Sequence, residues 1–234
     1  MPKDPADTRL LLLEAAERLM AEHGADGVSL REISAGAGQA NNNAAAYHFG
    51  SREGIIEAVL DLRMGPIDAR RSEMIAAPKS TSSLHELVRA VVVPLAEASR
   101  QHEHYIGFFA QLRVSRRYSR LVTHATPRMA SFAAVRDQID ARLADLAPSE
   151  RSQRRWLCGA LIVHAIAEFV AAPAEQPYES WDELVEGIVT ACVHVLGGSA
   201  DARGAKPRAA AGRAAGSKQG RTAGARTPRP KRSP

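Results

Sequence analysis

Three consecutive asparagines, Asn41–Asn43, follow Gln39 near the amino terminus. A side-chain amide donates and accepts hydrogen bonds at the same time, which matches the N6 and N7 atoms of adenine in the major groove of DNA. Asparagine is also one of the residues that most often cap the start of a helix. We therefore expect one of the three asparagines to cap a helix and at least one other to contact a base, and either role is open to each. The segment contains no arginine, so it does not predict recognition of guanine.

The flanking sequence predicts two short helices around these amides. Ser29 and Glu32 have the spacing of a capping box, in which each side chain bonds a free backbone N–H of the other residue. Gly38 ends this helix, because glycine can turn the chain without steric cost. A second helix is expected over residues 41–48. Two short helices joined by a glycine turn form a helix-turn-helix, whose second helix enters the DNA major groove.

Two helix starts are candidate sites for the DNA backbone. Ser51 and Arg52 begin a long predicted helix that runs to about residue 75, where free N–H groups and a guanidinium can hold one phosphate. Ser29 and Arg31 occupy similar positions in the helix before the turn. Arg31 is equally compatible with a charge that only faces solvent.

Residues 8–60 resemble the N-terminal DNA-binding domain of TetR/AcrR-type transcriptional repressors. The matching pieces are Thr8-Arg9, the run Leu12–Ala16, Leu19-Met20, Gly24, the segment SLREIS, Ala37-Gly38, Tyr47-His48-Phe49 and Ser51-Arg52-Glu53. The pattern AGQxNNxAxxYHFGSREG is similar to a subgroup with a longer turn and recognition helix, since Tyr47 stands nine positions after Gly38.

The resemblance implies that Tyr47 and His48 contact phosphate. A tyrosine hydroxyl and an imidazole N–H at a helix end can reach backbone oxygens without reading the sequence. The Tyr47 ring can also pack in the small core and leave only its hydroxyl in solvent.

The rest of the chain is expected to be helical. Apolar residues recur at helical spacing and no segment alternates as a strand, so we predict an all-α protein. Ser83 with Glu86 and Ser180 are expected to cap later helices. Within the long fourth helix, Pro66 lacks a backbone donor and predicts a kink. We thus predict an N-terminal three-helix domain that contains the helix-turn-helix (1–52). The long fourth helix joins it to a helical regulatory and dimerisation domain (53–198), and a basic tail follows (199–234).

The resemblance also implies that the second domain binds a small molecule and that its last two helices pair with those of a second subunit. The apolar faces of 157–169 and 188–195 agree, because they are wide enough to need partners on more than one side. A homodimer would read both halves of a pseudo-palindromic operator. Polar residues in apolar surroundings are the candidate ligand contacts: Tyr105, Gln111, His164 and Glu168. For His164 and Glu168, four residues apart, the simpler interpretation is a satisfied pair within a buried interface.

Net charge divides the chain into two unequal parts. The tail carries ten lysines and arginines against one aspartate, a net +9, so the other residues sum to −4 although the whole chain is +5. DNA affinity must then come from a local surface, with the tail as an additional attraction. The tail is poor in large apolar residues, so we expect it to be disordered.

The remaining composition excludes several classes of protein. Cys158 and Cys192 are too few for a disulfide framework or a zinc site and are interpreted as small core residues, which fits a reducing cytoplasm. The amino terminus is polar, without the pattern of a signal peptide, and the most apolar segment, 157–174, carries two ionisable residues, so no membrane span is expected. His102 and His104 diverge on a helix, so we expect no metal; no catalytic motif or cofactor loop appears, so we expect no enzyme.

The leading hypothesis is therefore a dimeric, ligand-responsive transcriptional regulator, a repressor, that releases double-stranded operator DNA when a small hydrophobic effector bends the fourth helix near Pro66. The alternative is a helical dimerising module whose basic tail binds nucleic acid or an acidic partner without sequence preference.

Overall fold

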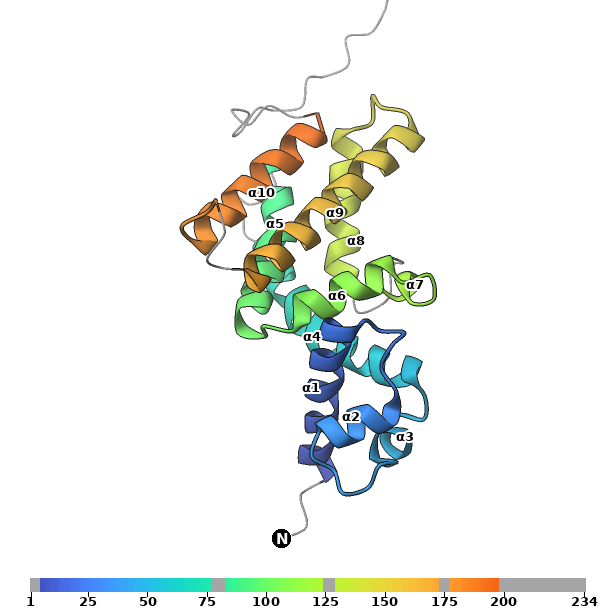
Figure 1. Cartoon of the computed structure of the whole chain (residues 1–234). Helices are drawn as coiled ribbons and strands as arrows, with labels where there is room; N and C mark the ends of the chain where they lie inside the picture. Colours follow the sequence, from blue (N-terminus) through green and yellow to red (C-terminus); the bar gives the residue numbers. More distant parts are fainter. Residues whose placement is uncertain (1–4, 77–82, 124–128, 173–176, 198–234) are drawn as a thin grey trace, which may run out of the picture.

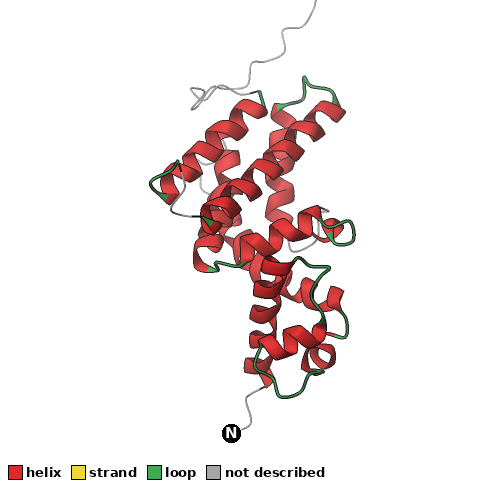
Figure 2. Ribbon diagram, viewed as in Figure 1, coloured by secondary structure: helices red, strands yellow, loops and turns green. Residues whose placement is uncertain are grey.

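A computed structural model describes residues 5–76, 83–123, 129–172 and 177–197. These residues form helices joined by loops, with no strand among them (Figure 2). The prediction of an all-α fold is confirmed. The predicted basic tail, 199–234, lies outside the described residues.

Three helices and the start of a fourth form one end of an elongated molecule (Figure 1). They are α1 (Pro5–His23), α2 (Leu30–Gly36), α3 (Ala44–Phe49) and α4 (Arg52–Ala76). Their core includes Leu12, Met20, Ile33 and Ile56, each with no exposed surface. Because α4 packs against both α1 and α3 and continues into the rest of the molecule, it is shared between the two ends.

The other end is a bundle of helices (Figure 1). They are α5 (Leu84–Gln101), α8 (Ala130–Arg142), α9 (Pro148–Ala171) and α10 (Trp181–Val195). Between the ends lie α6 (Tyr105–Val114) and α7 (Ser119–Thr123). Since α6 packs on α1 and on α9, a second connection besides α4 joins the two ends. None of the described helices is both long and apolar enough to cross a membrane.

Helix starts follow the sequence closely. Both bonds of the capping box between Ser29 and Glu32 are present at α2. Ser51 Oγ accepts the N–H of Gly54 at 3.0 Å, and Ser180 caps α10. At α5 one bond of the expected box is present, from the Glu86 N–H to Ser83 Oγ at 3.2 Å. Pro66 lies inside α4, which continues to Ala76, and the kink at Pro66 stays a prediction.

Candidate nucleic-acid interface

The second helix of the turn is shorter than predicted. Because α3 begins at Ala44, Asn41–Asn43 lie in the turn before it. Asn41 Oδ1 accepts the N–H of Asn43 at 2.9 Å, a turn that asparagine side chains commonly form. Asn43 occupies the capping position, but its side chain makes no capping bond. Its ψ of 7° is far from the extended conformation of a capping residue, so the prediction that an asparagine side chain caps this helix is wrong.

The remaining polar residues of this segment face solvent. Asn42 and Asn43 are exposed, and within the described parts of the chain neither side chain has a bonding partner. Tyr47 is 85% exposed, so the alternative that its ring packs in the core is wrong. The ring meets that of half-buried His48 edge-on, with centroids 5.3 Å apart. These four residues form a polar ridge around the start and the outer face of α3.

Ser34 positions this ridge, although the sequence did not predict a role for it. Ser34 is fully buried on α2. Its hydroxyl accepts the N–H of Ala45 at 3.0 Å and donates to the carbonyl of Leu30 at 2.9 Å. The signal in the sequence was a serine on the apolar side of α2, beside Ile33. This one side chain fixes the first turn of α3 against α2.

An open groove of about 600 Å³ collects most of the predicted DNA contacts. It is lined by residues from the start of α2, the turn, α3, the start of α4 and the loop after α6: Ser29, Leu30, Arg31, Asn42, Asn43, Ala46, Ser51, Arg52, Glu53 and Arg117. Six predicted residues from three segments thus share one concave surface. Arg52 also donates to the carbonyl of Asp26 at 3.1 Å, which steadies its guanidinium beside the start of α4.

The other predicted DNA contacts lie outside the groove lining. Gln39 is half-buried, and its side chain donates to the carbonyl of Ala37 at 3.2 Å. The Asn41 side chain accepts the N–H of Asn43 within the turn. Tyr47 and His48 stand beyond the groove on α3.

Arg117, in the loop between α6 and α7, reaches this groove from the middle of the molecule. Its guanidinium donates to the Glu53 carboxylate at 2.7 and 2.9 Å. This hydrogen bond holds the pKa of Glu53 below its usual value. Arg117 therefore neutralises a carboxylate that would otherwise repel phosphate at the start of α4. Nearby, Ser115 donates to the Asp26 carboxylate at 3.0 Å, so the loop is tied to the amino-terminal end twice.

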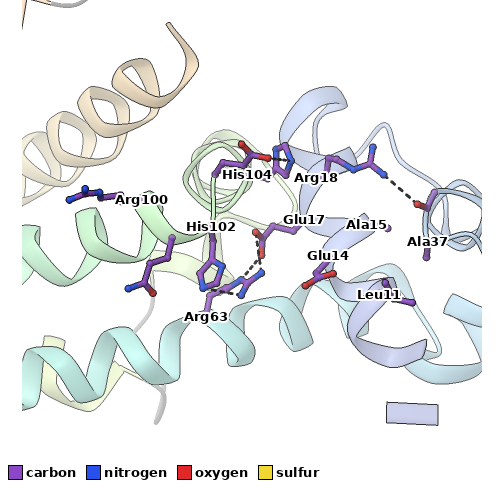
Figure 3. Close-up of a pocket in the computed structure, with 13 residues that line it drawn as sticks. Leu11, Glu14, Ala15, Glu17, Arg18, Ala37, Arg63, Arg100, His102 and His104 are labelled. Carbon is purple, nitrogen blue, oxygen red and sulfur yellow. Dashed lines mark hydrogen bonds and ion pairs between the residues drawn. The ribbon is translucent and has the colours of Figure 1, made fainter. Parts of the chain in front are cut away.

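A second contact between the two ends lies in a cleft of about 520 Å³ at the junction of α1, α4 and the end of α5. Figure 3 shows Glu17, Arg63 and His102 pointing toward one another there. Arg63 donates to the nearly buried Glu17 carboxylate at 2.7 Å, and its other branch lies 3.2 Å from His102 Nε2. His102 must be neutral to accept this bond. His104 instead faces Glu103, so the two histidines take different partners.

We expect this contact to weaken in acid. Burial, and then the Arg63 charge, hold the pKa of His102 below its ordinary value. As the pH falls below about 6.5, His102 is therefore protonated in the unfolded chain while it is still neutral in the folded protein. The free energy of unfolding declines over this interval, until the pH falls below the lower pKa of His102 in the folded protein. Urea unfolding at pH 8 and at pH 5.5 measures this. His102→Gln, which keeps an acceptor without a charge, should lose less stability than the natural protein over that interval; equal losses would contradict the assignment.

A buried polar cluster ties α4 to α8. The Asp68 carboxylate accepts the N–H groups of Ser131 and Phe132, at 3.1 and 3.3 Å, in the first turn of α8. It also pairs with Arg71 at 3.3 Å, whose side chain is only 4% exposed. Arg71 in turn donates to the carbonyl of Ala90 in α5 at 3.1 Å. One carboxylate of α4 thus caps another helix and balances a buried cation.

The four candidate ligand contacts are not gathered in one place. Tyr105 is fully buried, and its hydroxyl donates to Met64 Sδ at 2.9 Å. Gln111 is half-buried beside Gly24. His164 and Glu168 are exposed on α9 in the single chain, and their burial in an interface stays a prediction.

An apolar cavity of about 80 Å³ lies elsewhere, among α5, α8, α9 and α10. Its lining includes Val88, Phe132, Ile162 and Leu196, and none of the four candidate ligand contacts reaches it.

These elements define an all-helical protein with an amino-terminal helix-turn-helix and a larger helical bundle. Residues 12–59 match the family described as bacterial regulatory proteins, tetR family. The matched segment contains most of α1, the helix-turn-helix and the first turns of α4.

Two solved structures share the fold. One is of a protein from Shewanella sp. PV-4 assigned to the TetR family of transcription regulators, with a TM-score of 0.57 and 17% identity over 81% of this chain and 95% of that one. The other, from Rhodococcus sp., has the same assignment, a TM-score of 0.51 and 18% identity over 82% of this chain and 99% of that one. No curated protein matches the chain in sequence. The fold is that of TetR-type regulators.

Proposed function

We propose that the protein is a ligand-responsive transcriptional regulator, a repressor, that binds a pseudo-palindromic operator as a dimer. The observation that carries this proposal is the pair of exposed amides, Asn42 and Asn43, which have no bonding partner among the described residues and lie in a groove between two helix starts. Amides read adenine, and helix starts with serine and arginine bind phosphate. The similar proteins from Shewanella and Rhodococcus carry the assignment of transcription regulators.

Each predicted DNA contact receives a role in this proposal. Asn42 and Asn43 contact bases, whereas Ser29, Arg31, Ser51 and Arg52 line the phosphate sites of the groove. Tyr47 and His48 contact the backbone from the outer face of α3. Asn41 and Gln39 shape the turn. The DNA-binding unit includes the first turns of α4, because Ile55, Ile56 and Val59 are buried there.

The exposed face of α9 supports a homodimer. Trp156, Leu157 and Leu161 are 66%, 51% and 38% exposed, a large apolar area for one helix. Leu157 and Leu161 share a helical face with His164 and Glu168, by their spacing of four, seven and eleven residues. We place the subunit contact on this face, where His164 and Glu168 would become buried between two chains.

The response to a ligand is assigned to the apolar cavity. Its volume of about 80 Å³ is small, so a hydrophobic effector must part the helices around it. Movement of α8 would pull on Asp68 and hence on α4, which leads to the helix-turn-helix. Coupling of this kind needs a ligand that prefers one state by about 1–3 kcal/mol.

Selection of bound sequences from random double-stranded DNA tests the proposal. We expect an inverted repeat whose half-sites lie about one helical turn apart. The alternative is a module that binds nucleic acid through its basic tail, so the selection is repeated with residues 199–234 removed. The same motif with a shallower salt dependence supports the regulator. Failure to enrich any motif, or loss of the motif with the tail, supports the alternative.

A further inference from the structure

The only two cysteines of the chain meet where α9 packs on α10. Cys158 Sγ lies 3.6 Å from the carbonyl oxygen of Cys192, and Cys192 Sγ lies 4.0 Å from the carbonyl oxygen of Cys158. Each thiol therefore points at the main chain of the other residue. Both are buried, 7% and 0% exposed, as the sequence predicted for small core residues. Burial of two separate cysteines does not require this mutual approach.

Both cysteines also line the apolar cavity among α5, α8, α9 and α10. The cavity gives a small uncharged molecule room beside the sulfur atoms, while the surrounding helices exclude a bulky one. Two arginines, Arg136 and Arg155, belong to the same lining. The Arg155 guanidinium is paired with Asp140. The thiols are therefore enclosed but have space beside them.

The two thiols are chemically unequal. The contact with Cys192 lowers the pKa of Cys158, whereas the same contact and burial raise the pKa of Cys192. A thiolate is the nucleophile in reactions with peroxides and disulfides. Cys158 also keeps 7% of its surface exposed whereas Cys192 keeps none, so peroxide reaches Cys158 first and Cys192 is left to resolve the product.

We propose that Cys158 and Cys192 form a reversible dithiol–disulfide site that hydrogen peroxide oxidises through the cavity. The Cys158 thiolate attacks one peroxide oxygen, the O–O bond breaks, and the departing hydroxide takes a proton to become water. The sulfur of Cys192 then attacks the sulfenic sulfur of Cys158, the S–S bond forms, and the hydroxyl leaves as a second water with the Cys192 proton. Two thiols lose two electrons in total, and one peroxide becomes two waters.

The disulfide would join α9 to α10 across the wall of the cavity. Cys158 is followed directly on α9 by Gly159 and preceded by Leu157, which belongs to the proposed subunit contact. Oxidation therefore changes the cavity and fixes the helix that carries the contact. Formation of the disulfide does not depend on the proposed DNA binding, so the two can fail separately.

Intact mass spectrometry of the reduced full-length protein treated with hydrogen peroxide tests the site. We expect the monomer to lose the mass of two hydrogens, with a peptide that joins residues 158 and 192. The melting temperature should rise by about 10 °C and return with dithiothreitol, because a cross-link restricts the unfolded chain. Glutathione disulfide is a bulkier oxidant, so it should oxidise the two thiols of the folded protein more slowly than peroxide does. In urea, where the thiols are accessible, the two oxidants should act equally readily.

Matched variants assign the two roles. Cys192→Ala should accumulate a sulfenic acid at Cys158, which dimedone traps once the oxidised protein is unfolded in urea, whereas Cys158→Ala should leave Cys192 unmodified. Circular dichroism melts of both variants check that they are folded. Two thiols that remain titratable in peroxide, or a disulfide found only between chains, would overturn the proposal.

Discussion

Replacing Asp68 by alanine is expected to destabilise the protein by about 3–5 kcal/mol, because it leaves a buried cation without its counter-ion. Arg71 is 4% exposed and has the Asp68 carboxylate as its partner in an ion pair. The same substitution removes the acceptor for the N–H groups of Ser131 and Phe132 at the start of α8. Urea unfolding followed by circular dichroism measures the loss.

Two further variants separate charge from packing. In Asp68→Ala combined with Arg71→Met the unpaired cation is gone, so part of the lost stability should return. Glu57→Ala, at an exposed position of the same helix, should change stability by less than about 0.5 kcal/mol. A loss below about 1 kcal/mol for Asp68→Ala would show that Arg71 finds solvent or another partner, contrary to the structure.

In the proposed ligand response, this cluster would link the bundle to the amino-terminal end. Phe132 and Ile139 of α8 line the apolar cavity, and the first turn of α8 is bonded to Asp68 of α4. The Glu17–Arg63 pair then joins α4 to α1. A displacement of α8 thus has a continuous path of bonded groups to the helix-turn-helix. The predicted bend at Pro66 is not required for this path, although Pro66 lies two residues from Asp68.

Local signals in the sequence predicted most helix starts correctly. Ser29, Ser51, Ser83 and Ser180 each accept a backbone N–H of the following turn, because a cap depends only on residues three positions apart. The start of α3 was predicted wrongly for the opposite reason. It is set by Ser34, eleven residues before Ala45, which supplies the acceptor from another helix.

The candidate DNA-binding groove and the cysteine pair show the same contrast between residues close in the sequence and residues from distant segments. Residues close in sequence, such as Asn42, Asn43 and Arg52, were predicted to share a site and do line one groove. Arg117 enters that groove from 64 residues beyond its partner Glu53, so no spacing rule could find it. The cysteines likewise became a pair only through the packing of α9 on α10.

The four candidate ligand contacts lie apart because polarity alone does not show which way a side chain points, and their role stays a prediction. The partner of Tyr105 is Met64, 41 residues away in the chain. Five of the eleven residues that line the apolar cavity are aliphatic, and polarity in the sequence does not single these out from other core residues.

On the operator obtained by selection, Asn42→Ala and Asn43→Ala are each expected to weaken binding by about 1–3 kcal/mol, or roughly 5- to 150-fold. The side chains of both residues lack partners in the described structure and line the groove, so their loss removes base contacts without disturbing the fold. Fluorescence anisotropy with labelled operator measures the affinity. Thermal melts of both variants should match that of the natural protein.

The comparison with unrelated DNA decides what these amides do. If they read bases, Asn42→Ala and Asn43→Ala lower operator affinity while binding to unrelated DNA is unchanged, so the specificity ratio falls. Arg31→Ala serves as the matched control, because loss of a phosphate contact weakens both kinds of DNA by a similar factor and reduces the salt dependence. Equal weakening on both DNAs by the asparagine variants would assign the amides to the backbone, and retained operator affinity would remove them from the interface.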